Sequence, residues 1–332
     1  MKTKYTIIGV AIIIIIAGSY GYTLVNKEEQ EQPETSIVEV NLAYQFGFHY
    51  GQNVIMDHFN LIEKYSGGKL TANFMKISGG STINEAIVTK NIDFASMSAA
   101  AAINGIDNGV DTKILISMGM KVAEIWTWRE DIQSIEDFSE GDIVATVNLG
   151  STQYVSLTKA YLDIGRTREE AQAIMGFFSH ADALQLMIQR EIDAAFSGPP
   201  YTTEYEKMGY HKIADEATIW GTYLPGSCMI GRVEFCEEHP EAIAAVLMAW
   251  FEATEYIISN PREASEIIGE AYEYDADEAW DLWQEASLEW NPTYGLSALE
   301  ELASMMYQLG FTENDLTFED ICFKQTLGLM GR

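Results

Sequence analysis

From residue 36 onward, short apolar runs typical of strands alternate with longer runs whose apolar residues recur at helical spacing. The run KLTANFMKI alternates with period two, as a half-buried strand does, whereas residues 50–65 place apolar residues such as Val54 and Phe59 on one helical face. The pattern predicts strands at residues 36–44, 69–77, 92–97 and 111–120, and helices at residues 50–65 and 79–90. This β-α-β-α-β order is typical of a parallel sheet covered by helices.

The same order of elements starts again after residue 140. It predicts strands at residues 142–147, 176–179 and 192–196, and helices at residues 150–165 and 181–190. Thr167 and Glu170 have the spacing of a capping box for a further helix. Residues 86–95 (AIVTKNIDFA) also align with residues 186–195 (LMIQREIDAA) at an offset of 100. The repeated sequence and element order predict two similar α/β lobes rather than one extended sheet.

Two runs of extended type, residues 122–130 and 218–232, are expected to link the lobes. A chain that leaves the first lobe, builds the second and returns crosses twice between them, and two such hinge strands produce a cleft that closes. From residue 237 to the end the pattern is mainly helical. We therefore expect lobe 1 at residues 37–127 and 222–332, and lobe 2 at residues 128–221.

The first 26 residues form a separate segment, in which Lys2 and Lys4 precede an uncharged run that includes Ile12–Ile16. About 20 apolar residues cross a bilayer as a helix, and positive charge keeps the preceding end inside the cell. Residues 1–26 are predicted to be a signal peptide or an N-terminal membrane anchor, with a buried core strand as the alternative. Residues 27–36 are polar and predict a flexible linker. The rest of the chain is expected to be extracytoplasmic.

Charge and cysteine content narrow the class of protein. The 332 residues include 20 Lys and Arg against 50 Asp and Glu, a formal net charge of −30. A chain this acidic repels phosphate backbones, so nucleic acid is excluded as a partner. Cys228, Cys236 and Cys322 form neither a disulfide framework nor a metal-ligand spacing. Three buried thiols are expected, with a Cys236–Cys322 bridge as the alternative for an exported protein.

The candidate binding residues lie in the turns that follow the predicted strands. In open parallel sheets, ligands bind beyond the carboxyl ends of the strands, where helix N-termini present N–H groups. Gly-Ser-Thr occurs at such a turn in each half; the glycine lets a ligand approach, and the hydroxyls and the helix dipole favour an anion. The expected ligand-binding residues are Gln45, Phe48, His49, Tyr50, Gly80, Ser81, Thr82, Ser96, Ser98, Gly150, Ser151, Thr152, His180, Asp182, Ser197 and Tyr201.

Each of these residues also has a purely structural explanation. Ser, Thr and Asp are common helix caps, and aromatic residues such as Phe48 pack in cores. His49 and His180 are expected to make neutral hydrogen bonds, and we predict no metal site because no carboxylate cluster accompanies them. Asp93 and Asp193 are expected to be structural. The Walker, GxSxG, HExxH, CxxC and GxGxxG motifs are absent from the sequence, so we predict neither an enzyme nor a cofactor.

Five segments carry a resemblance to a known family: VNLAYQFGF, GGSTINEAIVTKNIDFASMS, NLGSTQYVSLTKAYL, HADALQLMIQREIDAAFSGPPY and VEFCEEHPEAIAAVLMAWFEATEYIISNPREASEII. With them the chain resembles the solute-binding proteins of ABC importers for nitrate, sulfonate, taurine and related compounds, which include pyrimidine-precursor binders. The resemblance covers about residues 36–310. The chain lacks the cysteine-rich motif of the eukaryotic branch that makes a thiamine pyrimidine, and no lipid-anchor Cys follows its apolar N-terminal segment.

The resemblance implies an α/β fold of the two-lobed periplasmic-binding-protein type II class, with two open, mostly parallel sheets joined by two hinge strands. It implies that a small anionic or zwitterionic solute is captured between the lobes and delivered to an ABC permease and its ATPase. Two alternatives stay open. One is an enzyme on the same scaffold, for which His49, His180 and Asp182 are the candidates, and the other is an extracellular ligand-sensor module.

Overall fold

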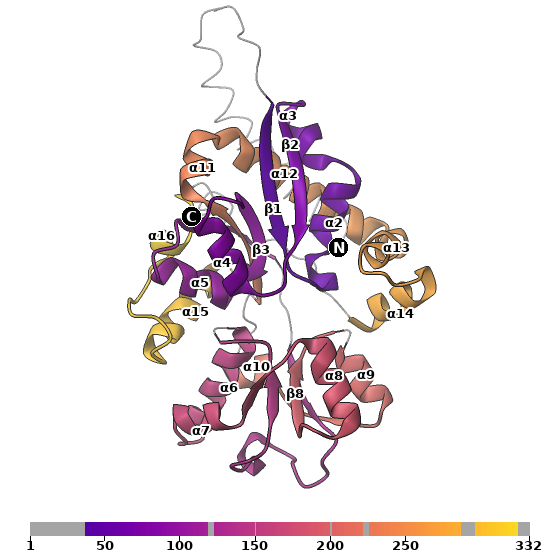
Figure 1. Ribbon diagram of the computed structural model, residues 1–332, viewed down its shortest axis with the longest axis vertical. Coiled ribbons are helices and arrows are strands. Elements are labelled where there is room, and N and C mark those ends of the chain that lie inside the picture. Colours follow the sequence, from indigo (N-terminus) through magenta and orange to yellow (C-terminus); the bar gives the residue numbers. More distant parts are fainter. Residues whose placement is uncertain are drawn as a thin grey trace, which may run out of the picture.

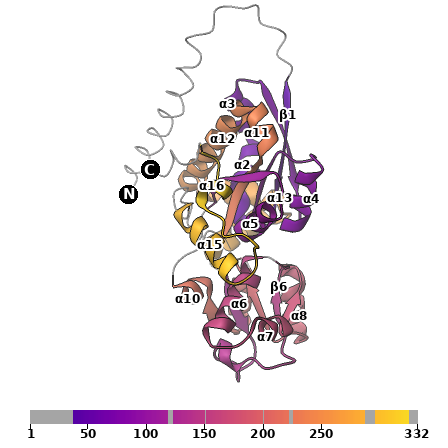
Figure 2. The same ribbon diagram turned by 90° about the vertical axis from the view of Figure 1, so that its left-hand side faces the viewer.

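The fold was analysed in a computed structural model that describes residues 37–118, 123–149, 151–199, 201–221, 226–286 and 296–324. The predicted signal peptide or anchor at residues 1–26, the predicted linker at residues 27–36, and Gly150 lie outside the described residues. Two lobes lie one above the other along the long axis of the molecule (Figures 1 and 2). Each lobe is built on one five-stranded sheet, which confirms the prediction of two α/β lobes.

The first sheet has the strand order β2-β1-β3-β10-β4. Its strands are β1 (Val38–Tyr44), β2 (Leu70–Lys76), β3 (Phe94–Ser98), β4 (Thr112–Ser117) and β10 (Ser227–Arg232). β1 is parallel to β2 and β3, whereas β10 is antiparallel to both β3 and β4. Four strands therefore run in one direction and one runs against them. The four predicted strands of this half are confirmed.

The second sheet has the strand order β7-β6-β8-β5-β9. Its strands are β5 (Glu124–Thr127), β6 (Val144–Thr146), β7 (Met175–Phe177), β8 (Ala194–Ser197) and β9 (His211–Asp215). β6 is parallel to β7 and β8, and β5 is antiparallel to β8 and β9. The edge strand β9 was not predicted because its residues are only partly buried and show little apolar alternation.

The chain passes between the lobes twice, between β4 and β5 and again between α10 (Glu216–Trp220) and β10. β5 and β10 are the reversed strands, and each is the first strand after a crossing. The predicted boundary after residue 127 placed β5 in lobe 1, but β5 pairs within the second sheet. The extended run predicted from residue 218 is also wrong at its start, because Thr218–Trp220 are helical.

Apolar side chains fill both faces of the first sheet. Because successive strand residues point to opposite faces, Leu42 of β1 joins one buried cluster and Ala43 joins the other. The first face is covered by α2 (Gly51–His58), α3 (Leu61–Ser66), α11 (Val233–Glu238), α12 (Pro240–Ser259), α13 (Pro261–Ala271) and α14 (Ala276–Ala286). The second face is covered by α4 (Gly80–Val88), α5 (Ala99–Asp107), α15 (Leu296–Gln308) and α16 (Phe318–Ile321).

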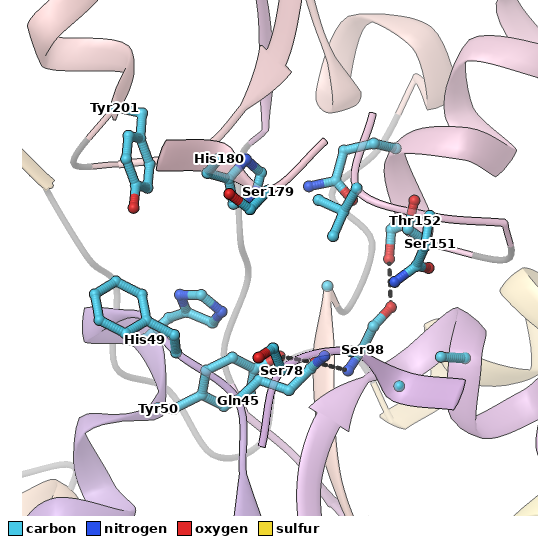
Figure 3. A pocket seen from close by; sticks show the side chains of 18 of the residues that line it. Gln45, His49, Tyr50, Ser78, Ser98, Ser151, Thr152, Ser179, His180 and Tyr201 are labelled. Carbon is cyan, nitrogen blue, oxygen red and sulfur yellow. Dashed lines mark hydrogen bonds between the residues drawn. The ribbon is translucent and has the colours of Figure 1, made fainter. Parts of the chain in front are cut away.

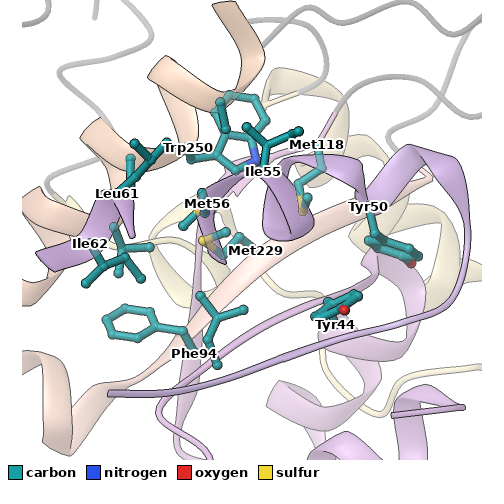
Figure 4. Packing of buried hydrophobic residues seen from close by; sticks show 14 of the residues in the cluster. Tyr44, Tyr50, Ile55, Met56, Leu61, Ile62, Phe94, Met118, Met229 and Trp250 are labelled. Atoms are coloured by element: carbon teal, nitrogen blue, oxygen red, sulfur yellow. The ribbon is translucent and has the colours of Figure 1, made fainter. Parts of the chain in front are cut away.

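One predicted helix is divided in the structure, and another helix has the length of a membrane span. The helix predicted at residues 50–65 is divided into α2 and α3, because Asn60 adopts a left-handed conformation with φ 49°. α12 is long and apolar enough to span a membrane by length and composition. Its apolar residues are instead packed inside lobe 1, where Trp250, 1 % exposed, lies in one buried cluster with Ile55 and Met56 of α2 (Figure 4).

Lobe 2 carries its helices on both sides of the second sheet: α6 (Thr152–Asp163), α7 (Arg168–Ala173), α8 (His180–Gln189), α9 (Tyr201–Lys207) and α10. The capping box of Thr167 and Glu170 is present at the start of α7 and confirms that prediction. Cys228, Cys236 and Cys322 are buried free thiols, as predicted. Burial raises the pKa of the Cys236 and Cys322 thiols to about 12.

The sequence repeat at an offset of 100 is a structural repeat. In lobe 1, Lys90 ends the α4 turn in a left-handed conformation with φ 58°, and Asp93 then begins the approach to β3. Asp93 accepts the Asn41 N–H through Oδ2 (2.9 Å) and the Arg232 guanidinium through Oδ1 (2.7 Å). Arg232 is the last residue of β10, so this carboxylate ties the reversed strand to β1 and β3.

Lobe 2 repeats the arrangement. Arg190 has φ 57°, and Asp193 accepts the Ile143 N–H through Oδ2 (2.8 Å) and the Arg129 guanidinium through Oδ1 (3.0 Å). Arg129 follows β5, the reversed strand of this sheet. We call each of these pairs, Asp93–Arg232 and Asp193–Arg129, an Asp–Arg staple. They confirm the structural role predicted for the two aspartates.

Candidate functional site

A cavity of about 360 Å³ lies between the two lobes (Figure 3). Its walls come from the turns that follow the strands, as the position of ligand sites in open α/β sheets predicts. The lobe 1 wall consists of Gln45, Phe46, His49, Tyr50, Ser78, Gly79, Gly80, Ser98, Ala101 and Gly226. The lobe 2 wall consists of Val147, Asn148, Ser151, Thr152, Gln153, Ser179, His180, Ala181, Tyr201 and Glu216.

Close backbone packing shapes the lobe 1 wall where β2 turns into α4. Gly79 has φ 91°, a conformation that favours glycine, and it precedes the first residue of α4. A Cβ at Gly80 would lie 2.5 Å from the Cβ of Ala101 in α5. Both glycines are therefore needed for α4 and α5 to bring their N-termini together at the cavity.

Four helices direct their N-termini at the cavity: α4, α5, α6 and α8. Ser151 caps α6 by accepting the Tyr154 N–H, and Ser179 caps α8 by accepting the Asp182 N–H. At α4 and α5, as far as the described residues show, no side chain caps the helix. The positive ends of these helix dipoles favour an anionic or hydrogen-bond-accepting group in the cavity.

The charged side chains of the cavity do not supply that positive potential. Of the described residues that line it, none is Lys or Arg, and Glu216 contributes a buried carboxylate. Glu216 accepts the Ala123 N–H through Oε2 (3.2 Å) and lies 3.5 Å from the Ser156 hydroxyl through Oε1. Any acceptor group in this cavity must therefore be bound by neutral donors and helix N-termini.

Aromatic and imidazole rings stand on both walls. In lobe 1 the His49 and Tyr50 ring centroids are 4.1 Å apart, and in lobe 2 the His180 and Tyr201 centroids are 5.4 Å apart. Figure 3 shows Tyr201 and His180 opposite His49 across the gap. Burial is the main cause that raises the pKa of Tyr201, to about 12, so its hydroxyl stays protonated. These rings are suited to contact the body of an organic molecule.

His180 also bears on the enzyme alternative. Its Nδ1 lies 3.1 Å from the Ser197 hydroxyl, a pairing that resembles a nucleophile and its base. Ser197 is 1 % exposed and is not part of the cavity wall. The contact therefore orients the imidazole and does not present a nucleophile to a bound molecule.

The lobes are joined by a ring contact between Tyr154 of α6 and Phe311, with centroids 5.2 Å apart, and by two contacts that involve polar groups. Inside the cavity, the hydroxyls of Ser98 and Thr152 are 3.1 Å apart and hydrogen-bonded (Figure 3). Outside it, Arg168 of α7 donates to the backbone carbonyls of Leu309 (3.3 Å) and Gly310 (2.8 Å), which follow α15 of lobe 1. The Arg168 guanidinium also lies 4.4 Å from the centroid of the Phe311 ring. We call this second contact, Arg168 with residues 309–311, the interlobe clasp.

The structure brings nine of the predicted binding residues to the cavity: Gln45, His49, Tyr50, Gly80, Ser98, Ser151, Thr152, His180 and Tyr201. Six others do not line it: Phe48, Ser81, Thr82, Ser96, Asp182 and Ser197. Phe48 packs against Tyr272 and Trp283, and Ser81 and Thr82 are exposed on α4. Asp182 was expected to cap α8, but the cap is Ser179; the Asp182 carboxylate instead accepts a hydrogen bond from the Ser179 hydroxyl.

Several cavity residues were not predicted. Gly79, Asn148 and Ser179 lie in the turns predicted to bind, and Ser78 directly precedes one of them. Each is one or two positions from a residue that was named, so the turn was predicted and the side chain was not. Glu216 was missed because neither β9 nor α10 was predicted. Its signal in the sequence was Asp215, which caps α10 by accepting the Thr218 N–H. Among the described residues, no group of three or more His, Cys, Asp and Glu could hold a metal ion.

Two mostly parallel five-stranded sheets, with a cavity between them at the carboxyl ends of their strands, define the two-lobed periplasmic-binding-protein fold. A model of the NMT1-like family matches residues 31–269, and the chain belongs to that family. Among curated proteins, none matches the chain.

Solved structures share the fold at low sequence identity. The alkanesulfonate-binding protein of Xanthomonas axonopodis pv. citri, bound to MOPS, is 12% identical with a TM-score of 0.69, over 89% of this chain and 99% of that one. The periplasmic aliphatic sulphonate-binding protein of Escherichia coli is 16% identical with a TM-score of 0.67, over 88% and 93%. The periplasmic nitrate-binding protein of Synechocystis PCC 6803 is 14% identical with a TM-score of 0.70, over 90% and 88%. These three are binding proteins.

Proposed function

We propose that this protein is the extracytoplasmic solute-binding component of an ABC importer. In this proposal it captures a small anionic or zwitterionic solute of the nitrate, sulfonate and taurine class between its lobes and delivers it to the permease, which the ATPase drives. Residues 1–26 export the chain and, if they are not cleaved, anchor it to the membrane. The sulfonate-binding and nitrate-binding proteins that share the fold support this proposal.

The observation that carries the proposal is the composition of the cavity. Four helix N-termini and neutral donors surround it, and none of its described lining residues is Lys or Arg. Such a site binds an acceptor group through hydrogen bonds rather than through a salt bridge. Its volume of about 360 Å³ is near the lower end of small-molecule sites, which span about 300–1,000 Å³. Within the class, an organic sulfonate uses this volume and the aromatic walls better than nitrate does.

Solute binding acts on this fold by favouring closed lobes, because the solute contacts both walls only when the lobes are together. Walls from separate lobes, joined by two chain crossings, provide the geometry for such a hinge motion. No reaction is required for this function, and the cavity is proposed to hold and release its solute unchanged.

A thermal-unfolding screen of the purified protein tests the proposal. The panel contains nitrate, bicarbonate, taurine, alkylsulfonates, pyrimidines and amino acids. A solute at about 100 times its Kd stabilises the protein by about 2.7 kcal/mol. Each kcal/mol raises the Tm of a chain of this size by about 1–2 °C, because the entropy of unfolding is about 2.1 cal/mol/K per residue. Ser98→Trp, which fills the cavity from the start of α5, is the control and should abolish the shift. The proposal is wrong if nitrate, taurine and alkylsulfonates all leave the Tm unchanged, or if the control shifts equally.

A further inference from the structure

The side chain of Gln45 is held in one orientation at the floor of the cavity. Gln45 follows the last residue of β1, and its Oε1 accepts two hydrogen bonds, from the Ser98 N–H (2.9 Å) and from the Tyr50 hydroxyl (2.9 Å) (Figure 3). A backbone N–H is only a donor, so the atom that faces it must be the amide oxygen. The Gln45 NH₂ group is therefore on the other side of the amide, where it has two N–H bonds to donate.

A buried polar network keeps this orientation in place. Tyr50 is 3 % exposed, and its backbone carbonyl accepts the Asn53 Nδ2–H (2.9 Å). Asn53 Oδ1 in turn accepts the Ser96 hydroxyl (2.8 Å). Burial also raises the pKa of Tyr50, so its hydroxyl remains a donor at all physiological pH values. Ser96 was expected from the sequence to contact a ligand. It instead holds Asn53, which in turn holds Tyr50, the residue that donates to Gln45.

We propose that Gln45 is the specificity-determining residue of the cavity, which selects solutes that present a hydrogen-bond acceptor to its fixed NH₂ group. This inference rests on the proposed function and adds the residue that distinguishes one kind of solute from another. The Ser98 and Thr152 hydroxyls rotate and serve as donor or acceptor, so they do not discriminate between the two kinds of group. Gln45 discriminates because turning its amide over would bring its NH₂ group against the Ser98 backbone N–H, which can only donate.

The carboxyl or sulfonate oxygen of an anionic or zwitterionic solute is the acceptor that this site fits. A solute that offers only donors, such as an alkylamine, would bring an N–H group against the Gln45 NH₂ and leave both unpaired. An unpaired buried donor costs more than an ordinary hydrogen bond contributes. The difference in binding free energy between an acceptor solute and a donor solute is therefore larger than the free energy of the single hydrogen bond that the amide forms.

Gln45→Glu tests the inference. The new side chain has the same shape, and one of its oxygens can accept from Ser98 and Tyr50 as before, while the other presents an acceptor with negative charge in place of the NH₂. Gln153→Glu is the matched control, because Gln153 of α6 lines the same cavity and the change adds the same charge in lobe 2. Calorimetry measures the affinity of native protein and both variants for taurine, an alkylsulfonate and an alkylamine.

We expect Gln45→Glu to weaken binding of the alkylsulfonate about 100-fold or more, and Gln153→Glu about tenfold or less. Equal losses in the two variants would overturn the inference and leave the proposed function standing. Native protein that binds only the alkylamine, or no member of the panel, would overturn both. If Gln45→Glu does not fold, Gln45→Met replaces it; this variant removes the donors without adding charge, and an unchanged affinity there also overturns the inference.

Discussion

The interlobe clasp predicts that a residue outside the cavity sets the affinity of the site. Arg168→Ala removes the hydrogen bonds to Leu309 and Gly310 and the guanidinium contact with Phe311, all of which join lobe 2 to lobe 1. Arg166 provides a matched control. It donates to two backbone carbonyls, those of Phe138 (2.6 Å) and Glu136 (2.7 Å), and lies over the Tyr161 ring. All of these partners of Arg166 belong to lobe 2.

The size of the effect follows from the contacts. A hydrogen bond from a charged donor contributes about 1.5–3 kcal/mol when buried, but the 3.3 Å bond to Leu309 is long and the bond to Gly310 is exposed. A cation–π contact at an exposed site adds about 0.5–1 kcal/mol, and ordering the arginine side chain offsets up to about 2 kcal/mol. We expect a net loss of about 1.4 kcal/mol, which corresponds to a tenfold change in an equilibrium constant.

Calorimetric titration with the solute that stabilises the native protein most measures this loss. Since the clasp stabilises only the closed lobes, Arg168→Ala should raise the apparent Kd about tenfold in a protein that is open without solute. Arg166→Ala should lower the free energy of unfolding and leave the Kd within about twofold. Equal changes in Kd for the two variants, or an unchanged Kd for Arg168→Ala, would refute the reasoning that the clasp stabilises the closed arrangement of the lobes.

Three further outcomes are expected. Asp93→Ala removes the buried one of the two carboxylate partners of the Arg232 guanidinium, the other being the half-exposed Glu234. It should lower the free energy of unfolding by about 3–5 kcal/mol in denaturant titration, and a loss below about 1 kcal/mol would contradict the staple. Ser151→Ala should cost about 1 kcal/mol because Ser151 caps α6, whereas Ser81→Ala on the exposed surface should cost almost nothing. Hydrogen bonds from the Thr317 hydroxyl and N–H hold the pKa of Asp320 below its ordinary value of 3.8. The stability they confer is present above that value and lost as the pH falls through the lowered pKa, so the Tm of Asp320→Asn should depend less on pH in this acid range than the native Tm does.

The fold was predictable because it is encoded by repetition. Apolar periodicity located most strands, and the match of residues 86–95 with residues 186–195 was enough to indicate two lobes. The match also extended to details that a pattern alone does not explain, since Lys90 and Arg190 share a left-handed conformation. The edge strand β9 was not predicted because its residues are only partly buried and show no strong apolar alternation.

The site was predictable to the level of the turn but not of the side chain. Strand ends and Gly-Ser-Thr turns pointed to Gly80, Ser98 and Thr152, and all three line the cavity. Ser81 follows Gly80 directly and yet is exposed, because the phase of α4 relative to α5 decides which residue of the first turn faces inward. The orientation of the Gln45 amide depends on Tyr50 and Ser98, which come together only when β1 and β3 pair. No local pattern encodes that contact.

The reversed strand β10 also fixes the order in which the molecule is completed. It lies between β3 and β4, so it is an interior strand of the first sheet, yet β4 ends at Ser117 and β10 begins at Ser227. Every strand of the second sheet lies within that interval. As the chain emerges from its N-terminus, lobe 2 has all its strands while lobe 1 still lacks the strand between β3 and β4, so the facing edges of β3 and β4 are unpaired. A chain truncated after residue 221 should therefore contain a complete lobe 2 attached to an aggregation-prone half of lobe 1.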